Sequence, residues 1–519
     1  MKFLSTDSIL LKRIIYALFI LFFAFITLKI FPVSEHILTD AAYYLMGAES
    51  IAKGNGFYSY NVGYLEDASI NDFKNLIPIT RYQPLLSVTI AAVSKLLGIN
   101  ILLASRVVNI LFYAVFLFTW LVLYQKLFSN TGYFAIASLF LLFTAQIYTY
   151  FLPPHSEMLF IALLGVLGNL IYFWHDAKSI KVQFFYTFLL AFISILIVLT
   201  RYAGIGFIVA FFIGFLLVFQ ASDFRQRIVH FFVYGVTFSI GFGFWAYRNM
   251  VAMGAITSKY PDNYHGTLFD FDRIVEILNY FLGFSLGFPS RIENYLFLLL
   301  IPILLIIGYL FYKKYYATNP VSLWLLISVT VYVSMIIYMG IGNRAVDKIN
   351  GFMRFFALLQ PFLVAILVLM LRSLFQLKEN ILAKLSIIFI VSILAISLLS
   401  GMNRTRIFIQ TLHKAEENNG FYESIRQKAT ESDLILSNQW QNVSARTALP
   451  IVQIHYKQDI DNYVLKYKGK YNKIYIVLLK DVGVTYRQGV DTWQELLKDK
   501  QVTIIAENPE TIFVEFKEK

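Results

Sequence analysis

The chain has 519 residues, of which 58% are apolar, 17% aromatic and only 15% charged, and its mean hydropathy is +0.64. Soluble domains contain about 45–50% apolar and about 25% charged residues, so the composition indicates a membrane protein and excludes a disordered chain. Cysteine is absent, which excludes disulfides, zinc–thiolate sites and a cysteine nucleophile. The formal net charge is +12, an excess that in a soluble protein would suggest nucleic acid as a partner.

Long apolar runs dominate the first four fifths of the chain. A helix needs about 20 apolar residues to cross a bilayer, and eleven runs approach this length: 14–31, 101–124, 133–151, 156–174, 184–200, 203–220, 228–248, 293–312, 321–340, 354–372 and 383–402. The first run follows Lys12 and Arg13 without a small-residue cleavage pattern, which favours an uncleaved anchor over a signal peptide. We therefore predict an α-helical polytopic membrane protein with about eleven transmembrane helices.

The loop charges predict an orientation. Positive charge collects in the short cytoplasmic loops of membrane proteins. With the N-terminus in the cytoplasm, the inner loops are rich in cations and poor in acids, whereas the outer segment 32–83 is acidic; these inner loops are 1–13, 125–132, 175–183, 221–227, 313–320 and 373–382. An odd number of spans then places the tail after residue 402 outside. The basic balance is a consequence of topology, and nucleic acid is not an expected partner.

The outer segment 32–100 is too long to be a simple connection. Its start predicts a helix with Thr39 or Asp40 as N-cap and Gly54 or Gly56 as terminator. Its end is an apolar helix of about 15 residues led by Pro84, a length that suits a helix lying at the membrane interface. A second long outer segment, 249–292, contains another amphipathic stretch.

The tail, 403–519, is polar and predicts a separate small α/β extracytoplasmic domain beside the transmembrane domain 1–402. Residues 433–438 and 473–480 are typical of buried strands, and 492–499 are typical of a helix. The segments VTIIAE and TIFVEF predict a closing hairpin.

Asp40 is the strongest candidate for a catalytic group. It stands just outside the first span, at the head of the outward helix, where a carboxylate could take a proton from an acceptor hydroxyl or amine. The alternative is that Asp40 or Thr39 only caps the helix, because Asp is among the best capping residues. The two roles are compatible.

Several cations are candidates for binding a phosphate. Arg201 lies in LTRYAGIGF between two apolar runs, where an arginine faces a cavity or a phosphate, or else extends to the interface. Arg344, Lys348 and Arg354 lie in an outer loop and could hold an anionic lipid headgroup specifically or by ordinary surface contact. Arg81, in ITRYQP, is a similar candidate.

His155 and Glu157, in LPPHSEMLF, form an outward turn and helix start. An acid at a helix N-terminus is favoured by the helix dipole alone, so a purely structural role stays open for Glu157. The seven histidines show no pairing at helical spacing, and no HExxH, GxSxG or phosphate-loop motif is present. We therefore expect no cofactor, and a divalent metal has no support in the residue pattern.

The order of the motifs resembles that of the membrane-embedded GT-C glycosyltransferases, specifically the bacterial relatives of protein O-mannosyltransferases and aminoarabinose transferases. The resemblance covers about residues 1–400 and is carried, in chain order, by DAAYYLMGAESIAKGNGF, QPLLSVTIAAVSKLLG, SRVVN, LTRYAG and RFFALLQPFL. It implies a hexosyl- or pentosyltransferase of the plasma membrane that takes a sugar from a polyprenyl-phosphate donor on the outer face. The acceptor would be a lipid, a glycan or a protein.

The resemblance also implies site residues. The family's catalytic acid maps onto Asp40, and its phosphate-binding cations map onto Arg201 and onto Arg344 or Arg354. Many members carry two adjacent acids where this chain has Asp40 followed by Ala41, which counts against a two-acid or metal-assisted mechanism and leaves an inverting displacement with one base. The alternatives are a secondary transporter, although no internal repeat is visible, and a lipid-linked glycan polymerase or ligase.

Overall fold

The computed structural model describes most of the chain, in two units. The described residues are 9–30, 39–60, 76–80, 82–142, 155–218, 224–254, 320–342, 358–375, 381–412, 419–430, 432–438, 443, 446–447, 449, 451–454, 456–467, 469, 471–480, 492–509 and 511–517. Packing assigns them to unit 1 (Met1–Leu28, Asn109–Phe151, Ser156–Gln410) and unit 2 (Lys29–Val108, Leu152–His155, Thr411–Lys519). The predicted span 293–312, the amphipathic stretch in 249–292, and Arg81, Arg344, Lys348 and Arg354 lie outside the described residues.

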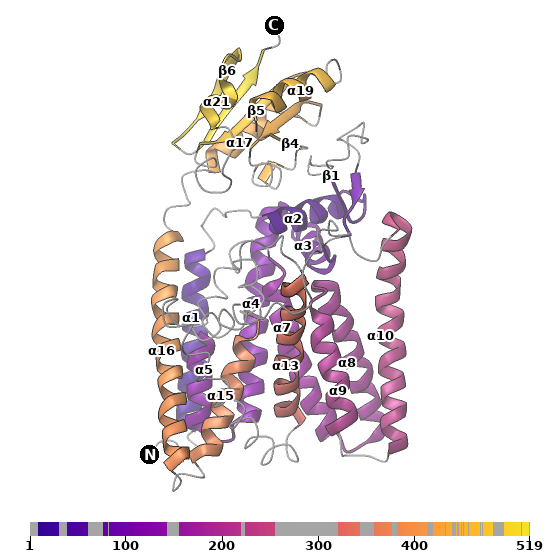
Figure 1. Cartoon of the computed structure of the whole chain (residues 1–519), viewed down its shortest axis with the longest axis vertical. Coiled ribbons are helices and arrows are strands. Elements are labelled where there is room, and N and C mark those ends of the chain that lie inside the picture. Colours follow the sequence, from indigo (N-terminus) through magenta and orange to yellow (C-terminus); the bar gives the residue numbers. More distant parts are fainter. Residues whose placement is uncertain are drawn as a thin grey trace. The chain divides into compact units, whose positions relative to one another are not determined.

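Long apolar helices form unit 1 and run side by side (Figure 1). They are α1 (Ile9–Ile30), α4 (Ile101–Leu127), α5 (Thr131–Leu142), α7 (Glu157–Asp176), α8 (Ile180–Thr200), α9 (Gly204–Val218), α10 (Phe224–Met253), α13 (Pro320–Gly342), α15 (Gln360–Phe375) and α16 (Ile381–Leu412), with the first turns of α4 and the ends of α1 and α16 belonging to unit 2. Each coincides with a predicted apolar run. Among the described residues, 4 helices are long and apolar enough to cross a membrane by length and composition. The total of about eleven spans stays a prediction.

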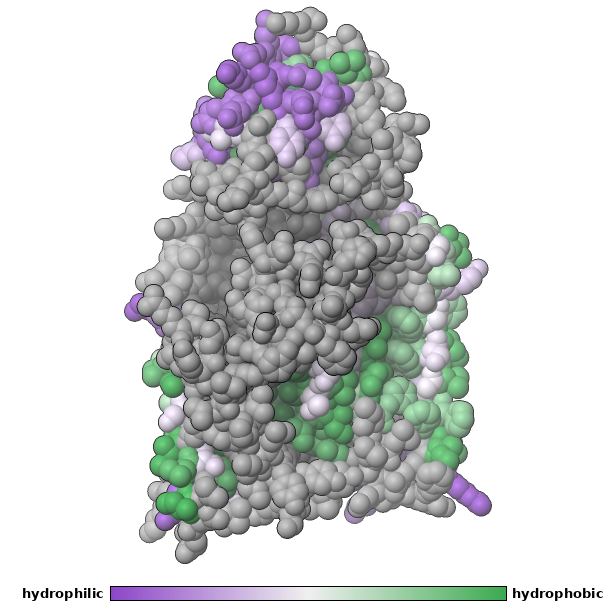
Figure 2. Space-filling model, in the orientation of Figure 1, coloured by the Kyte–Doolittle hydropathy of each residue, from purple (hydrophilic) through white to green (hydrophobic). Residues whose placement is uncertain are grey.

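The outer surface of these helices is apolar, as Figure 2 shows by its green side chains. On α10, exposed apolar residues recur at helical spacing along one face: Phe232, Val236, Ile240, Phe244, Tyr247 and Val251. Phe244 is 74% exposed and Val251 is 70% exposed. Water would oppose such a stripe, whereas lipid accommodates it, so the helices have the surface of a polytopic membrane protein.

The tail forms a five-stranded mixed sheet with the order β4-β3-β5-β7-β6. Its strands are β3 (Leu434–Ser437), β4 (Ile451–Gln453), β5 (Ile474–Leu479), β6 (Val502–Glu507) and β7 (Thr511–Phe516). Strands β3, β4 and β5 are parallel, and β7 pairs antiparallel with β5 and β6. The predictions of β3, β5 and the closing hairpin are confirmed. The assignment of the tail as a separate extracytoplasmic domain stays a prediction.

Helices cover both faces of this sheet. Because side chains alternate along a strand, Ile435 and Val477 point into one apolar cluster and Leu434 and Ile476 into the other. Helix α17 (Asn419–Lys428) packs in the first cluster, and α19 (Lys457–Tyr467) and α21 (Trp493–Leu497) pack in the second. The predicted helix at 492–499 corresponds to α21, whose first turn is closed by a capping box between Thr492 and Glu495.

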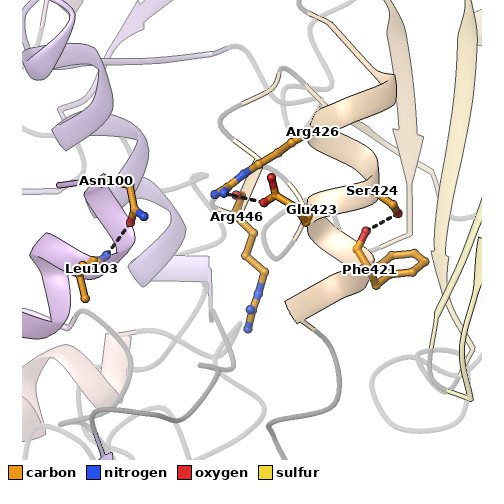
Figure 3. Close-up of polar contacts among 7 residues, drawn as sticks. All are labelled: Asn100, Leu103, Phe421, Glu423, Ser424, Arg426 and Arg446. Atoms are coloured by element: carbon orange, nitrogen blue, oxygen red, sulfur yellow. Dashed lines mark hydrogen bonds and ion pairs between the residues drawn. The ribbon is translucent and has the colours of Figure 1, made fainter.

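Polar contacts order the edges of unit 2 (Figure 3). The Arg426 side chain pairs with Glu423 and also donates to the carbonyl of Arg446. The guanidinium of Arg446, which is buried, lies 4.6 Å from the centre of the Tyr422 ring. At the start of α4, the Asn100 side chain accepts a hydrogen bond from the Leu103 N–H at 2.8 Å.

The segment 32–100 supplies α2 (Thr39–Ala52), the hairpin of β1 (Tyr58–Tyr60) and β2 (Leu76–Pro78), and α3 (Leu85–Leu97). Helix α2 ends two residues before Gly54, which has φ +87°, so the predicted terminator is confirmed. Helix α3 follows Pro84 and ends at Gly98, which has φ +65°. Helix α3 buries Leu86 and exposes Leu96, the amphipathic pattern expected of an interfacial helix, although its location at the interface stays a prediction.

Candidate functional site

Asp40 lies in the first turn of α2. Its Oδ1 accepts a hydrogen bond from the Tyr82 hydroxyl at 2.8 Å. Asp40 is partly accessible, whereas Tyr82 is buried. The helix begins at Thr39, so Asp40 is a first-turn residue rather than the N-cap, and a negative charge there is favoured by the helix dipole. A partly accessible carboxylate with a fixed orientation has the properties that a general base requires.

The tyrosine that contacts this carboxylate is packed against two others. The rings of Tyr43 and Tyr82 are stacked, with centroids 4.8 Å apart and planes 22° apart. Tyr44 meets Tyr82 edge-on at 5.6 Å, and its carbonyl accepts a hydrogen bond from the Ser87 hydroxyl on α3. The hydroxyl that contacts Asp40 therefore belongs to a ring that is held on two sides.

The contact between α2 and the β1–β2 hairpin depends on a glycine. A Cβ at Gly47 would lie 2.5 Å from the Phe57 ring and 3.1 Å from Ile79. Phe57 is buried, and its carbonyl accepts a hydrogen bond from the Ile79 N–H at 3.2 Å. The glycine thus lets the hairpin approach the helix that carries Asp40.

In unit 1, two predicted site residues form a buried ion pair. Arg201, which follows α8, places Nη1 2.6 Å from Glu157 Oε1 at the start of α7, and their side chains are 10% and 2% exposed. The same nitrogen donates to the Ser156 hydroxyl at 3.1 Å. The acid lies at a helix N-terminus and the cation at a helix C-terminus, so both dipoles favour the pair. Interaction with Glu157 therefore already offsets the Arg201 charge.

Of the remaining predicted site residues, the structure describes His155. His155 is buried directly before Ser156. The structure thus brings Glu157 and Arg201 together within unit 1, while Asp40 and His155 belong to unit 2. Within the described residues, no group of three or more His, Asp or Glu side chains is placed to hold a metal ion.

The sequence did not single out Tyr43, Tyr44 or Tyr82 as site residues. For Tyr43 the sequence does contain a signal, because Asp40 and Tyr43 are three residues apart, a spacing that places side chains on the same face of a helix. The approach of Tyr82, 42 residues later in the chain, could not be derived from any local pattern.

A second polar network in unit 1 was also missed. The Tyr202 hydroxyl, beside Arg201, accepts hydrogen bonds from Trp245 Nε1 at 2.9 Å and from Asn249 Nδ2 at 3.2 Å. Arg248 donates to the Asn249 side-chain oxygen at 2.9 Å. These contacts fix the end of α10 to the turn between α8 and α9.

Comparison with known proteins identifies the fold. No protein-family model matches the chain, and no curated protein matches it by sequence. Among solved structures, ArnT from Cupriavidus metallidurans bound to undecaprenyl phosphate matches with a TM-score of 0.59 at 12% identity, over 97% of both chains. The same protein in the apo state matches with a TM-score of 0.58 over the same shares.

An oligosaccharyltransferase from Archaeoglobus fulgidus, tethered with an acceptor peptide, matches with a TM-score of 0.50 at 12% identity. The match covers 85% of this chain and 65% of the archaeal one. Both proteins are membrane glycosyltransferases of the GT-C fold. The chain has this fold, as the motif order predicts.

Proposed function

We propose that the chain is an integral membrane glycosyltransferase that transfers a sugar from a polyprenyl-phosphate donor to an acceptor on the extracytoplasmic face. The observation that carries this proposal is the likeness, over 97% of both chains, to a protein solved with undecaprenyl phosphate. The motif resemblance maps the catalytic acid onto Asp40, and the position of Asp40 in the first turn of α2 is consistent with that role.

The proposed reaction is a single displacement at the anomeric carbon. The acceptor oxygen or nitrogen attacks this carbon while Asp40 takes the acceptor's proton, and the bond between the carbon and the phosphate oxygen breaks. The bonding electrons leave with the polyprenyl phosphate, which stays in the bilayer. Because attack is opposite the leaving group, the configuration is inverted.

Cations would stabilise the charge that develops on the phosphate. The proposed set is Arg344, Lys348 and Arg354, with Arg81 and Arg201. Since Arg201 is already paired with Glu157, we assign most of the stabilisation to the other four. His155, next to this pair in sequence, is proposed to contact the substrate.

The proposed location is the plasma membrane, with a cytoplasmic N-terminus and an extracytoplasmic tail. The transferred group is a hexose or a pentose, and the acceptor is a lipid, a glycan or a protein. The competing functions are a secondary transporter and a lipid-linked glycan polymerase or ligase. A transporter would leave the bond between the sugar and the phosphate intact, and a polymerase or ligase would transfer whole glycans instead of single sugars.

Incubation of the purified protein with polyprenyl-phosphate monosaccharides and a membrane extract tests the proposal. We expect release of polyprenyl phosphate together with a labelled acceptor for at least one sugar. A lipid-linked polymerase would instead join glycans carried on polyprenyl pyrophosphate. Absence of both release and transfer across the panel would contradict the proposed function and favour a transporter.

A further inference from the structure

The helix that carries Asp40 contacts the apolar core of the tail through two of its side chains. Met46 of α2 is 5% exposed and belongs to the same cluster as Phe421 and Ile425 of α17 and Val477 of β5. Tyr43 precedes Met46 by three residues, so the two side chains lie on the same face of α2, and Tyr43 packs against this cluster. All these residues lie in unit 2. Helix α2 therefore contributes a buried side chain to the apolar cluster on one face of the tail sheet.

Tyr43 connects this core to the carboxylate. The Tyr43 side chain packs against the tail cluster, and its ring stacks on the ring of Tyr82 with the centroids 4.8 Å apart. The Tyr82 hydroxyl in turn donates to Asp40 Oδ1 at 2.8 Å. A continuous series of contacts thus leads from the tail sheet through Tyr43 and Tyr82 to the proposed base.

The first turn of α2 requires packing from outside the helix to hold Asp40 in a fixed position. Asp40 lies in the first turn of a helix of 14 residues, and terminal turns are where helices fray. A general base works only when its carboxylate is held within a fraction of an ångström of the productive position. Packing from outside the helix supplies the rigidity that the helix end lacks.

We propose that Tyr82 is a positioning residue for Asp40 and that the tail, acting through Tyr43, keeps Tyr82 in place. This inference rests on the proposed function, because it assigns the tail a part in the same reaction. It makes the tail a component of the active site without any contact between the tail and the substrate.

Substitutions at the two tyrosines test the hydrogen bond and the stack separately. Tyr82→Phe keeps the ring and removes the donor, so kcat should fall about 10-fold or more with KM for the donor substrate unchanged. The acid limb of the pH–rate profile should also move to higher pH, because a donor that favours the charged carboxylate is lost. Tyr43→Leu, which removes the stacked ring, should reproduce the loss in kcat.

The result that overturns the positioning role is equally specific. If Tyr82→Phe leaves kcat and the pH profile unchanged, the hydrogen bond does not position the base. If Tyr43→Leu keeps the wild-type kcat, the stacked ring does not transmit support to Tyr82.

A matched pair in the tail tests the origin of the support. Phe421→Leu weakens the cluster that contains Met46, whereas Ile460→Val weakens the cluster on the opposite face of the sheet. Hydrogen exchange of the β5 amides reports tail stability in both variants. We expect faster exchange in α2 and lower kcat only in Phe421→Leu.

Equal exchange in α2 for the two variants, at matched exchange in β5, would overturn the coupling. The exchange measurement does not depend on turnover. If the wild-type protein transfers no sugar, the proposed function fails, while the exchange rates in α2 still decide whether the tail supports the helix.

Discussion

The ion pair between Glu157 and Arg201 explains how a charged guanidinium can be buried at the end of an apolar helix. Removing two charges from water costs several kcal/mol per ion, which the attraction between them and further hydrogen bonds must offset. Here the carboxylate lies 2.6 Å from the guanidinium, and the Ser156 hydroxyl accepts from the same nitrogen. Each of the two charged side chains can therefore be buried only because the other lies beside it.

Loss of one partner should destabilise unit 1 strongly. Glu157→Gln and Arg201→Met each leave an unbalanced buried group, and we expect each to cost about 3–5 kcal/mol. The double variant should cost clearly less than the sum, because neither charge remains. Thermal unfolding in detergent measures this cycle, with Arg225→Gln on the exposed start of α10 as control. Strict additivity would show that the two residues do not stabilise each other.

At the element scale, periodicity and composition predicted which segments form helices and strands. The apolar runs at 434–437 and 474–479 became β3 and β5 because both faces of those strands are buried. Strand β4 was missed because three residues carry no periodic signal. Helix α19 was missed although Ile460, Tyr463 and Val464 recur at helical spacing, because the segment is short and mostly polar. The contacts that build the candidate site, such as Tyr82 with Asp40, join segments distant in sequence and leave no local pattern.

Gly47→Ala should destabilise α2 although alanine is the better helix former by about 1 kcal/mol. The new Cβ would collide with the Phe57 ring at 2.5 Å and push the β1–β2 hairpin from the helix. Faster hydrogen exchange in α2 and lower activity should follow, and Phe57→Leu should rescue both in part. Gly420→Ala is the control, since a Cβ there meets nothing within 4 Å. Similar behaviour of the two alanine variants would contradict the packing argument.

The capping box of α21 should make the free energy of unfolding of the tail vary with pH in the acidic range. The backbone N–H of Thr492 donates to Glu495 and, as the largest cause, lowers the pKa of that carboxyl below its ordinary value of 4.5. Its contribution is therefore complete at neutral pH and is lost as the pH falls through the lowered pKa. Thr492→Ala should cost about 1 kcal/mol.

Glu495→Gln isolates the part of the capping box that titrates. The stability difference from the wild type should be present at pH 7 and should vanish at low pH, where both side chains are neutral. Because the chain has six tryptophans and no cysteine, a fluorescent dye on a single introduced thiol, Leu465→Cys on the exposed face of α19, follows unfolding of the tail as a function of pH. A difference of equal size at both pH values would mean that ionisation of Glu495 does not contribute.

At the scale of the whole molecule, the apolar surface and the sided loop charges predict one orientation in the membrane. The chain contains no cysteine, so a single introduced thiol can be labelled without background. In intact cells, an impermeant maleimide should label Lys53→Cys and Glu423→Cys. Lys178→Cys and Arg225→Cys should react only after permeabilisation. Labelling of the second pair in intact cells would invert the proposed topology.

Two carboxylates on α2, those of Asp40 and Glu49, provide the most direct test of the general base. Asp40→Asn should abolish transfer from a polyprenyl-phosphate sugar, because the amide cannot accept the acceptor's proton, while donor binding and thermal stability stay close to wild type. Glu49→Gln, which alters only the surface pair with Lys53, should retain full transfer. Undiminished transfer by Asp40→Asn would contradict the assignment of Asp40 as the base.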